Sequence, residues 1–528
     1  MSHAVGTRFV GRRFVLALLA LLLSLGLALS GGNAASAKGA KKPTTTSTTT
    51  TTTWPPLPSF DTALTWSDCD DGFQCATLTV PVDWSKPGVD SVPLALIRRP
   101  AAAPDQRIGS LVVNYGGPGE SGVDHLRTTY GRLPQTVRDR FDVVSFDPRG
   151  TGASRPIDCV DDAFLDLSAG IAAVPTTQAQ LDALHDYNAQ FAAGCVQRMG
   201  AYAGQVGTRN VARDLEAIRI ALGDPKLTYL GYSYGTAIGA AYAQMFPGSV
   251  GRLVLDGPPD YWISVRDYAY RQAKGFMDAL SGFLDWCQQT GCSLAASGAP
   301  RDQLDRLIAR VDQQPLPASY TSDGVTRNGE LTSGLLENAV ISLLYDRSRG
   351  WPLLADALAE AVNTGTAPSL LAYSDQFLGR AADGHWDPLV EANAVIGCVD
   401  RPAKATPTSA AELADVAIFQ SQLPPWGGSF ATASCVGMPK PARGDRLGDV
   451  SVRGTGPILV IGTTGDPAAP YVGAQALAAR IQGSDLLTFE STEHTAFGRA
   501  VSECIDDAVV AYLVDGTTPP PGTRCSPN

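Results

Sequence analysis

The sequence predicts an α/β fold, in which a mostly parallel sheet is flanked by helices and carries a large, mainly helical insertion. From residue 77, short apolar strands alternate with amphipathic helices, a pattern typical of parallel sheets covered on both faces. The alternation stops near residue 260 and resumes only at Pro457–Ile461. A gap of this size between two strands of one sheet indicates an inserted cap.

The first residues have the pattern of an export signal. A basic start with three arginines precedes the apolar run Phe14–Leu29, and Ala35-Ser36-Ala37 offers a small-residue cleavage site. The alternative is a membrane anchor, because the run approaches spanning length. We expect residues 1–37 to be a cleaved signal peptide and the mature protein to be extracellular or associated with the cell wall, with no membrane span.

Residues 38–56 are expected to be a disordered tether. Positions 44–53 hold nine threonines and one serine, which have no apolar side chains to bury. The composition of the whole chain, 44% hydrophobic and 18% charged, is that of a folded protein. Its net charge of −11 argues against binding to nucleic acid.

The folded part divides into a split core, 57–259 and 456–528, and a cap, 260–455. An opening hairpin is expected at Thr77–Val82 and Val92–Ile97. The core pattern continues with the strands Ser110–Asn114, Phe141–Phe146, Leu227–Leu230 and Leu253–Asp256 and the helices Asn210–Leu222 and Thr236–Phe246. In the cap, helical periodicity covers Tyr268–Trp286, Asp302–Val311, Leu331–Tyr345 and Leu353–Val362.

Ten cysteines support an oxidising compartment and a set of disulfides. None forms a Cys-x-x-Cys pair, so we expect no metal site, and no cofactor motif is present. Pairing of nearest neighbours is the favoured arrangement because it closes local loops; a free catalytic cysteine is the alternative. The cysteines are Cys69, Cys75, Cys159, Cys195, Cys287, Cys292, Cys398, Cys435, Cys504 and Cys525.

The segment Gly231-Tyr232-Ser233-Tyr234-Gly235 has the strongest functional signal. It follows the strand Leu227–Leu230 and opens the helix Thr236–Phe246. A serine between two glycines at such a strand-to-helix turn is lifted above the edge of the sheet, as the nucleophile of a hydrolase requires. We therefore expect Ser233 to be a nucleophile.

A serine nucleophile needs a base, and the base needs an orienting acid. His494 follows the strand Leu486–Phe489, which places it last in a Ser…Asp…His chain order. Asp466 follows the strand near Ile461 and lies 28 residues before His494. Asp485 is the competing acid, but it precedes a strand and so lies at the wrong edge of the sheet.

An oxyanion hole needs preorganised N–H donors. We expect the amide of Tyr234, directly after the nucleophile, to be one of them. The other should come from the loop after Ser110–Asn114, where Gly117 is the first choice and Gly116 the second. Glycines there let the backbone approach a substrate closely.

These motifs together resemble a known family. Gly116-Gly117-Pro118-Gly119, Asp147-Pro148-Arg149-Gly150 and the serine turn are similar to α/β-hydrolases of the proline iminopeptidase group. The export signal, the cap and Ala394-Val395-Ile396-Gly397-Cys398 narrow the resemblance to secreted tripeptidyl aminopeptidases of actinobacterial type. Their triad maps onto Ser233, Asp466 and His494. At position 469 this chain has alanine, where members of that family often have threonine. This difference affects the expected substrate range.

The resemblance implies a secreted, monomeric serine peptidase that releases tripeptides from free N-termini of peptide substrates through an acyl-enzyme. Such an enzyme must bind a protonated α-amine with carboxylates. The candidates are Glu120, Glu391, Asp400 and Glu493. A secreted carboxylesterase or lipase with the same triad is the alternative, and a catalytically silent binding protein is a third hypothesis.

Overall fold

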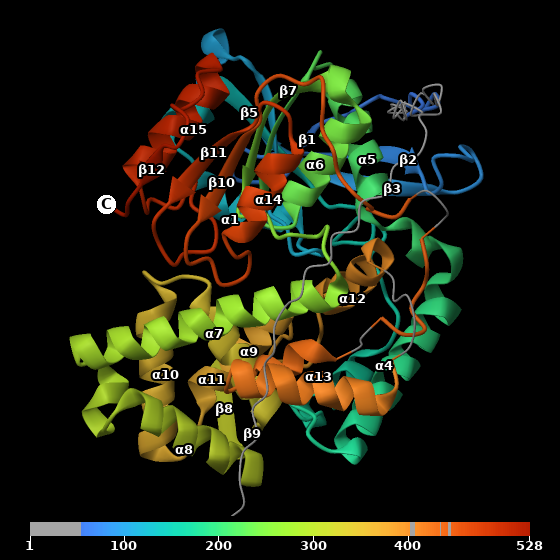
Figure 1. Ribbon diagram of the computed structural model, residues 1–528. Helices are drawn as coiled ribbons and strands as arrows, with labels where there is room; N and C mark the ends of the chain where they lie inside the picture. The colour runs from blue at the N-terminus through green and yellow to red at the C-terminus, as the bar shows by residue number, and fades with distance from the viewer. Residues whose placement is uncertain (1–53, 402–406, 433–434, 442–444) are drawn as a thin grey trace, which may run out of the picture. The chain divides into compact units, whose positions relative to one another are not determined.

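The computed structural model describes residues 54–401, 407–432, 435–441 and 445–528 (Figure 1). The predicted signal peptide, 1–37, and positions 38–53 of the predicted tether lie outside the described residues.

Ten strands in the described residues form one sheet in the order β1-β2-β3-β5-β4-β6-β7-β10-β11-β12. Neighbouring strands from β5 through β12 pair in parallel, whereas β1, β2 and β3 extend the sheet with antiparallel pairs up to β5. The mostly parallel sheet is the one that the sequence predicts. The strands are β1 Ser67–Asp68, β2 Gln74–Pro81, β3 Ser91–Arg99, β4 Gly109–Asn114, β5 Phe141–Phe146, β6 Leu227–Tyr232, β7 Val250–Asp256, β10 Leu459–Thr463, β11 Asp485–Phe489 and β12 Arg524–Cys525.

Helices cover both faces of this sheet because side chains of the central strands alternate between two buried clusters. In β4, Val112 packs with α5, α6 and α14, whereas Leu111 and Val113 pack with α1, α2 and α15. Such burial on both faces explains the nearly continuous apolar sequence of the central strands. The helices are α1 Gly122–Thr129, α2 Gln135–Arg140, α5 Thr208–Leu222, α6 Gly235–Met245, α14 Val472–Arg480 and α15 Glu503–Asp515.

The parallel pairing brings the carboxyl ends of five strands to one edge of the sheet. Strands β4, β6, β7, β10 and β11 end there at Asn114, Tyr232, Asp256, Thr463 and Phe489. Loops that leave this edge can therefore place side chains from distant parts of the chain next to one another.

The cap has its own apolar cluster, which includes Leu280, Phe283, Trp351 and Leu354. Figure 1 shows α7 running between the sheet and helices α8, α9, α10 and α11. Gly275 in α7 packs so closely on the Pro467 carbonyl that no side chain would fit there. The cap helices are α7 Val265–Thr290, α8 Pro300–Gln313, α9 Ser333–Leu344, α10 Gly350–Thr364, α11 Pro368–Leu378, α12 Leu389–Asp400 and α13 Ser409–Gln422.

The cap also contains a β-hairpin that the periodicity did not predict. Strands β8, Leu316–Ser322, and β9, Val325–Leu331, pair antiparallel around a two-residue turn. Asp323 and Gly324 both have positive φ, 51° and 77°, as the tight turns of hairpins require. The dipeptide Asp-Gly was the available signal, but the flanking strands are too polar to stand out by alternation.

A second segment joins the cap from within the first part of the core. Helices α3, Asp162–Asp166, and α4, Gln178–Met199, lie between β5 and α5 in the sequence, and α4 packs against α13 (Figure 1). Arg380 of the cap forms an ion pair with Asp166, with 2.7 Å between Nε and Oδ1. We therefore propose that this segment belongs to the cap, although the sequence places it in the core, 57–259.

Five disulfides join the ten cysteines, all of which lie in the described residues. The pairing is between nearest neighbours along the chain, the arrangement that the sequence favours. The bonds are Cys69–Cys75, Cys159–Cys195, Cys287–Cys292, Cys398–Cys435 and Cys504–Cys525.

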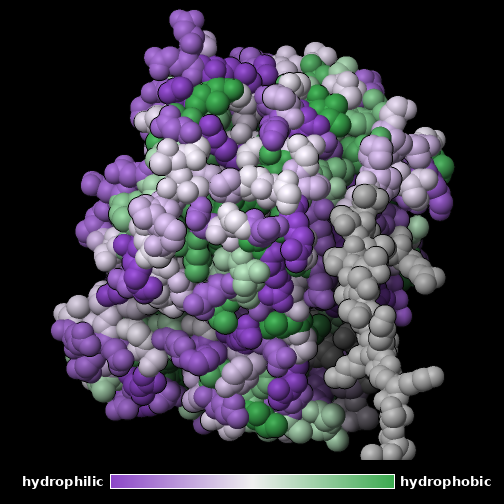
Figure 2. Space-filling model, turned by 45° about the horizontal axis from the view of Figure 1, so that its top comes forward, coloured by the Kyte–Doolittle hydropathy of each residue, from purple (hydrophilic) through white to green (hydrophobic). Residues whose placement is uncertain are grey.

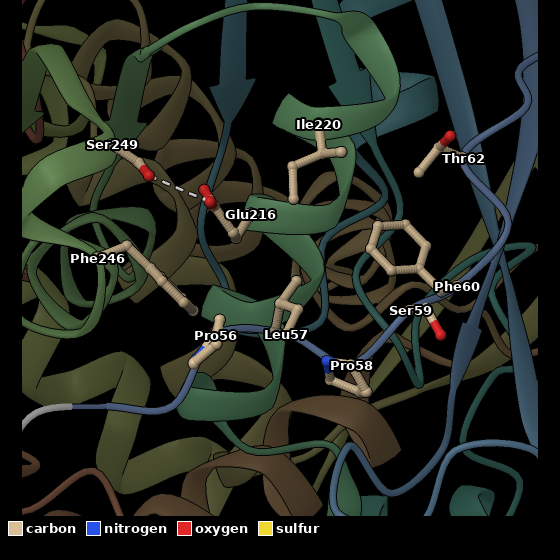
Figure 3. Close-up of a pocket in the computed structure, with 10 residues that line it drawn as sticks. All are labelled: Pro56, Leu57, Pro58, Ser59, Phe60, Thr62, Glu216, Ile220, Phe246 and Ser249. Atoms are coloured by element: carbon tan, nitrogen blue, oxygen red, sulfur yellow. Dashed lines mark hydrogen bonds between the residues drawn. The ribbon is translucent and has the colours of Figure 1, made fainter.

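The first described residues lie along α5 and line a cavity of about 440 Å³. Figure 3 shows Leu57 and Phe60 beside this helix, with Phe246 across the cavity. Glu216 in α5 accepts a hydrogen bond from Ser249 at 3.1 Å. This cavity lies where residues 56–62 pack on α5, and it shares no residue with the one that contains Ser233.

Hydrophilic side chains cover most of the face shown in Figure 2, and hydrophobic residues are scattered among them. The large apolar side chains are gathered in three buried clusters instead. Among the helices of the described residues, none is long and apolar enough to cross a membrane.

Candidate active site

Ser233 lies in a strained turn at the carboxyl edge of the sheet. Strand β6 ends at Tyr232 and α6 begins at Gly235, and the Ser233 φ of 51° is in the left-handed region that serine rarely adopts. A Cβ at Gly231 would lie 2.5 Å from the Gly235 carbonyl oxygen, so only glycine fits. The turn is fixed by a 2.8 Å hydrogen bond from the Ser233 amide to the Asp256 carbonyl. This is the geometry of a nucleophile elbow.

His494 and Asp466 form a buried pair. The His494 Nδ1 lies 2.8 Å from Asp466 Oδ1 and 2.9 Å from Oδ2. Asp466 Oδ1 also accepts the amides of Ala468 and Ala469, at 3.0 and 2.7 Å. The carboxylate is therefore held in place and can fix the imidazole with Nε2 turned away from it.

Ser233 and His494 line the same cavity of about 210 Å³. The chain thus brings three residues from the loops after β6, β10 and β11 to one site. Tyr345 of the cap contacts the histidine: its carbonyl accepts the His494 amide at 3.0 Å, and its ring meets the imidazole edge-on. Sequence reasoning did not single out Tyr345, since no pattern marks a residue that follows a cap helix.

The Gly116-Gly117 loop lies directly against the elbow. A Cβ at Gly116 would be 3.0 Å from Ser233 Cβ and 3.1 Å from the Tyr234 nitrogen. The Gly116 amide donates to Asn114 Oδ1 at 3.1 Å. In the described part of the chain, the amides of Gly117 and Tyr234 donate to no other group, which leaves both available to a substrate oxygen.

The four candidate carboxylates have different surroundings. Glu391 accepts the amides of Cys159 and Val160, at 2.7 and 3.0 Å, and burial raises its pKa to about 7. Asp400 accepts the amide of Thr208 at 2.8 Å, and burial raises its pKa to about 6.

The other two carboxylates lie nearer the edge of the sheet. Glu493 accepts the amide of Arg347 at 3.2 Å and lies 3.6 Å from the Arg499 guanidinium. Glu120 lies 2.8 Å from His125 Nε2, and about a third of its side chain is exposed. Glu391, Asp400 and Glu493 thus accept hydrogen bonds from backbone amides of other segments. Glu120 has one side-chain partner, and its carboxylate is accessible to solvent.

Asp256 is a buried acid that the sequence analysis placed at a strand end without assigning it a role. Its Oδ2 accepts the amides of Ala496 and Phe497 in the loop after His494, both at 2.9 Å. Burial raises its pKa to about 6. Its position at the carboxyl edge, beside the elbow strand, was the signal that could have found it. In the described residues, no group of three His, Cys, Asp or Glu side chains could hold a metal ion.

Comparison with known proteins identifies the family to which the chain belongs. A model of the alpha/beta hydrolase fold matches residues 109–297, and a model described as TAP-like protein matches residues 423–525. The chain is 37% identical to serine protease Hip1 of Mycobacterium tuberculosis, over 89% of this chain and 92% of the relative. It is 30% identical to a tripeptidyl aminopeptidase of Streptomyces lividans, over 88% and 87%. The chain belongs to the tripeptidyl aminopeptidase-like family of α/β hydrolases.

This family also includes relatives with esterase names. The chain is 35% identical to carboxylesterase B of Mycobacterium tuberculosis, over 90% of this chain and 92% of the relative. A proline iminopeptidase structure from Mycobacterium smegmatis is 15% identical, covers 83% of this chain and 98% of its own, and has a TM-score of 0.33. This family member is a serine hydrolase with peptidase relatives.

Proposed function

We propose that this protein is a secreted exopeptidase that releases tripeptides from free N-termini, with Ser233, His494 and Asp466 as its triad. The observation that supports it most is the buried His494–Asp466 pair in the cavity that contains Ser233. The peptidase names of the relatives support peptide substrates.

The proposed reaction is that of a serine hydrolase. Ser233 Oγ attacks the scissile carbonyl while His494 Nε2 takes the hydroxyl proton, and Asp466 stabilises the imidazolium. The amides of Gly117 and Tyr234 bind the oxyanion, each contributing about 3 kcal/mol to the lowering of the barrier. The C–N bond breaks as His494 gives its proton to the leaving amine, and water then hydrolyses the acyl-enzyme.

Glu120 is the carboxylate that best suits a substrate α-amine. Its side chain lies beside the oxyanion loop, since a Cβ at Gly117 would be 3.1 Å from Glu120 Cγ. An ammonium group there would gain a charge-assisted hydrogen bond without displacing a backbone donor.

Paired reporters test the proposal. The wild type should release a chromogenic amine from a free tripeptidyl reporter and leave the N-acetylated reporter intact. Ser233→Ala should abolish release, whereas Ser85→Ala, at an exposed turn, should retain it. Glu120→Gln should raise KM for the free reporter. Equal turnover of free and acetylated reporters would exclude the exopeptidase assignment.

A carboxylesterase is the second candidate, favoured by the 35% identity to carboxylesterase B. The same triad and oxyanion donors would act on an ester carbonyl. A short-chain acyl ester assayed beside the tripeptidyl reporter separates the two, because an esterase would turn over the ester and leave the amide intact.

A further inference from the structure

The cavity at Ser233 extends to one side of the proposed triad. Five of its lining residues belong to the loop from His494 to Arg499. Others come from α1 and the short helix η2, Tyr130–Arg132, that follows it. Neither Gly117 nor Tyr234, the proposed oxyanion donors, lines it.

This asymmetry places the cavity on the leaving-group side of the scissile bond. The carbonyl oxygen of a substrate must face the oxyanion donors, and the leaving group must depart beside the imidazole that protonates it. A cavity that is built around the histidine loop and excludes both donors is therefore the place for the residue that follows the scissile bond. Its volume of about 210 Å³ suits one residue rather than a long segment.

The lining of this cavity is basic. His125, Arg132 and Arg499 contribute to it, and none of its described lining residues is a carboxylate. Glu120, which pairs with His125 at 2.8 Å, does not itself line the cavity. The charge of Arg499 is balanced by Asp346, with Nη2 2.7 Å from Oδ2, and by Glu493. Arg132 is exposed and has no ion pair or hydrogen bond among the described residues.

The backbone of Arg132 is nevertheless fixed at the cavity. It ends η2, the following Leu133 is buried, and a Cβ at Gly498 would lie 3.4 Å from Leu133 and 3.7 Å from the Arg132 carbonyl oxygen. Burial and the nearby Arg132 charge lower the pKa of the His125 imidazole, another lining residue, but the Glu120 carboxylate outweighs them and the pKa is raised. The structure thus holds an uncompensated guanidinium beside the leaving-group site.

We propose that this cavity is a leaving-group subsite for a substrate carboxylate, which the Arg132 guanidinium binds. The inference rests on the proposed peptidase function and adds a substrate class to it. The carboxylate is either the side chain of Asp or Glu directly after the scissile bond or the terminal carboxylate of a one-residue leaving group. Both present two oxygens to the planar guanidinium.

Matched peptides test it. The first pair carries Glu or Gln after the scissile bond and has an amidated C-terminus; the second pair carries Ala there, with a free or an amidated C-terminus. The wild type should have a kcat/KM about fivefold higher for the anionic member of at least one pair, the gain of a partly exposed ion pair. Which pair responds identifies the source of the carboxylate.

Variants then assign the effect to Arg132. Arg132→Gln should bring the anionic-to-neutral ratio to about one, and Arg132→Lys should restore part of it. Arg138→Gln, a nearby arginine that does not line the cavity, should keep the wild-type ratio. A ratio of one in the wild type for both pairs, or an unchanged ratio in Arg132→Gln, would overturn the proposal.

A tripeptidyl reporter with an uncharged aromatic amine keeps the two proposals distinguishable. If the wild type cleaves this reporter in a Ser233-dependent manner but prefers neither anionic peptide, only the carboxylate subsite is wrong. If the wild type does not cleave it, the peptidase function itself fails.

Discussion

Asp256 connects the two halves of the proposed catalytic centre. Its backbone carbonyl accepts the Ser233 amide at 2.8 Å, and its side chain accepts the amides of Ala496 and Phe497 at 2.9 Å each. One residue therefore fixes both the elbow and the loop that carries His494. Because the proposed nucleophile and base must keep their relative geometry through the reaction, we expect Asp256 to be a positioning residue.

We expect Asp256→Ala to lower kcat at least tenfold and to destabilise the fold. Two buried amides would lose their acceptor, which costs about 1–3 kcal/mol for each group left unsatisfied. Asp256→Asn keeps a carbonyl oxygen for both amides and should lose less. Reporter kinetics and thermal unfolding of both variants provide the measurement. A kcat in Asp256→Ala equal to that of the wild type would show that the histidine loop holds its position without this acceptor.

The candidate site divides into residues that a local pattern reveals and residues that only packing reveals. Ser233 was predictable because the tight turn demands glycines within five residues, and chain order then indicated Asp466 and His494. Asp256 has no such pattern. Its role depends on the register between β6 and β7, which pairs Tyr232 with Asp256. No single segment of the sequence encodes that register.

At the scale of elements, helix α12 connects the cap to both sides of the proposed oxyanion hole. Asn393 donates to the Pro118 carbonyl at 2.9 Å, next to Gly117. Asp400, at the end of the helix, accepts the Tyr234 hydroxyl at 3.3 Å. Glu391 secures the same helix to the backbone after β5. Two of the carboxylates that the sequence offered for amine binding thus fasten this helix to the core.

Helix α9 contains a buried acid whose ionisation should affect the stability of the cap. Burial raises the pKa of Glu337 from 4.5 to about 8, although the Ser429 hydroxyl donates a hydrogen bond to it. Between these pH values the folded chain keeps a proton that the unfolded chain releases. The free energy of unfolding therefore falls as pH rises through this window, by up to about 1.4 kcal/mol per pH unit. The fall ends above pH 8.

We expect the thermal midpoint to fall between pH 5 and pH 8 and Glu337→Gln to reduce this fall. Glutamine keeps an acceptor for Ser429 and does not titrate. The measurement is the melting temperature of both proteins at several pH values, with Glu330→Gln, an exposed position in β9, as the control. Parallel pH profiles for the wild type and Glu337→Gln would contradict this account.

Elements with strong local signals were predictable, and those defined by distant partners were not. Helix α7 was expected from its periodicity, and its N-cap is Ser264, whose hydroxyl accepts the Asp267 amide at 3.0 Å. The association of α4 with the cap could not be read from its sequence. It depends on contacts such as His185 Nε2 with Glu412, 3.0 Å apart and 227 residues distant in the chain.

Across the whole described molecule, hydrogen bonds, ion pairs and apolar packing connect cap and core. Four of the five disulfides stay within one of them, and Cys159–Cys195 joins α4 to the loop after β5. The contacts include Arg271 with Asp260, 2.8 Å apart, and Arg499 with Asp346, 2.7 Å apart. Helices α7 to α13 are therefore joined to the core by non-covalent interactions, while the disulfides limit the unfolding of the segments that they close.

The disulfides should contribute unequally, because closing a longer loop removes more entropy from the unfolded chain. Cys159–Cys195 spans 36 residues and Cys287–Cys292 only 5. On the chain-entropy relation the longer loop contributes about 4 kcal/mol and the shorter about 2 kcal/mol. Replacing Cys159 and Cys195 with serine should thus lower the free energy of unfolding more than replacing Cys287 and Cys292.

The two pairs make a matched comparison, since three of the four side chains are fully buried and every change introduces the same hydroxyl. Urea unfolding of the two double variants measures the difference. Equal losses would mean that native packing around the bonds, rather than loop length, sets their contribution.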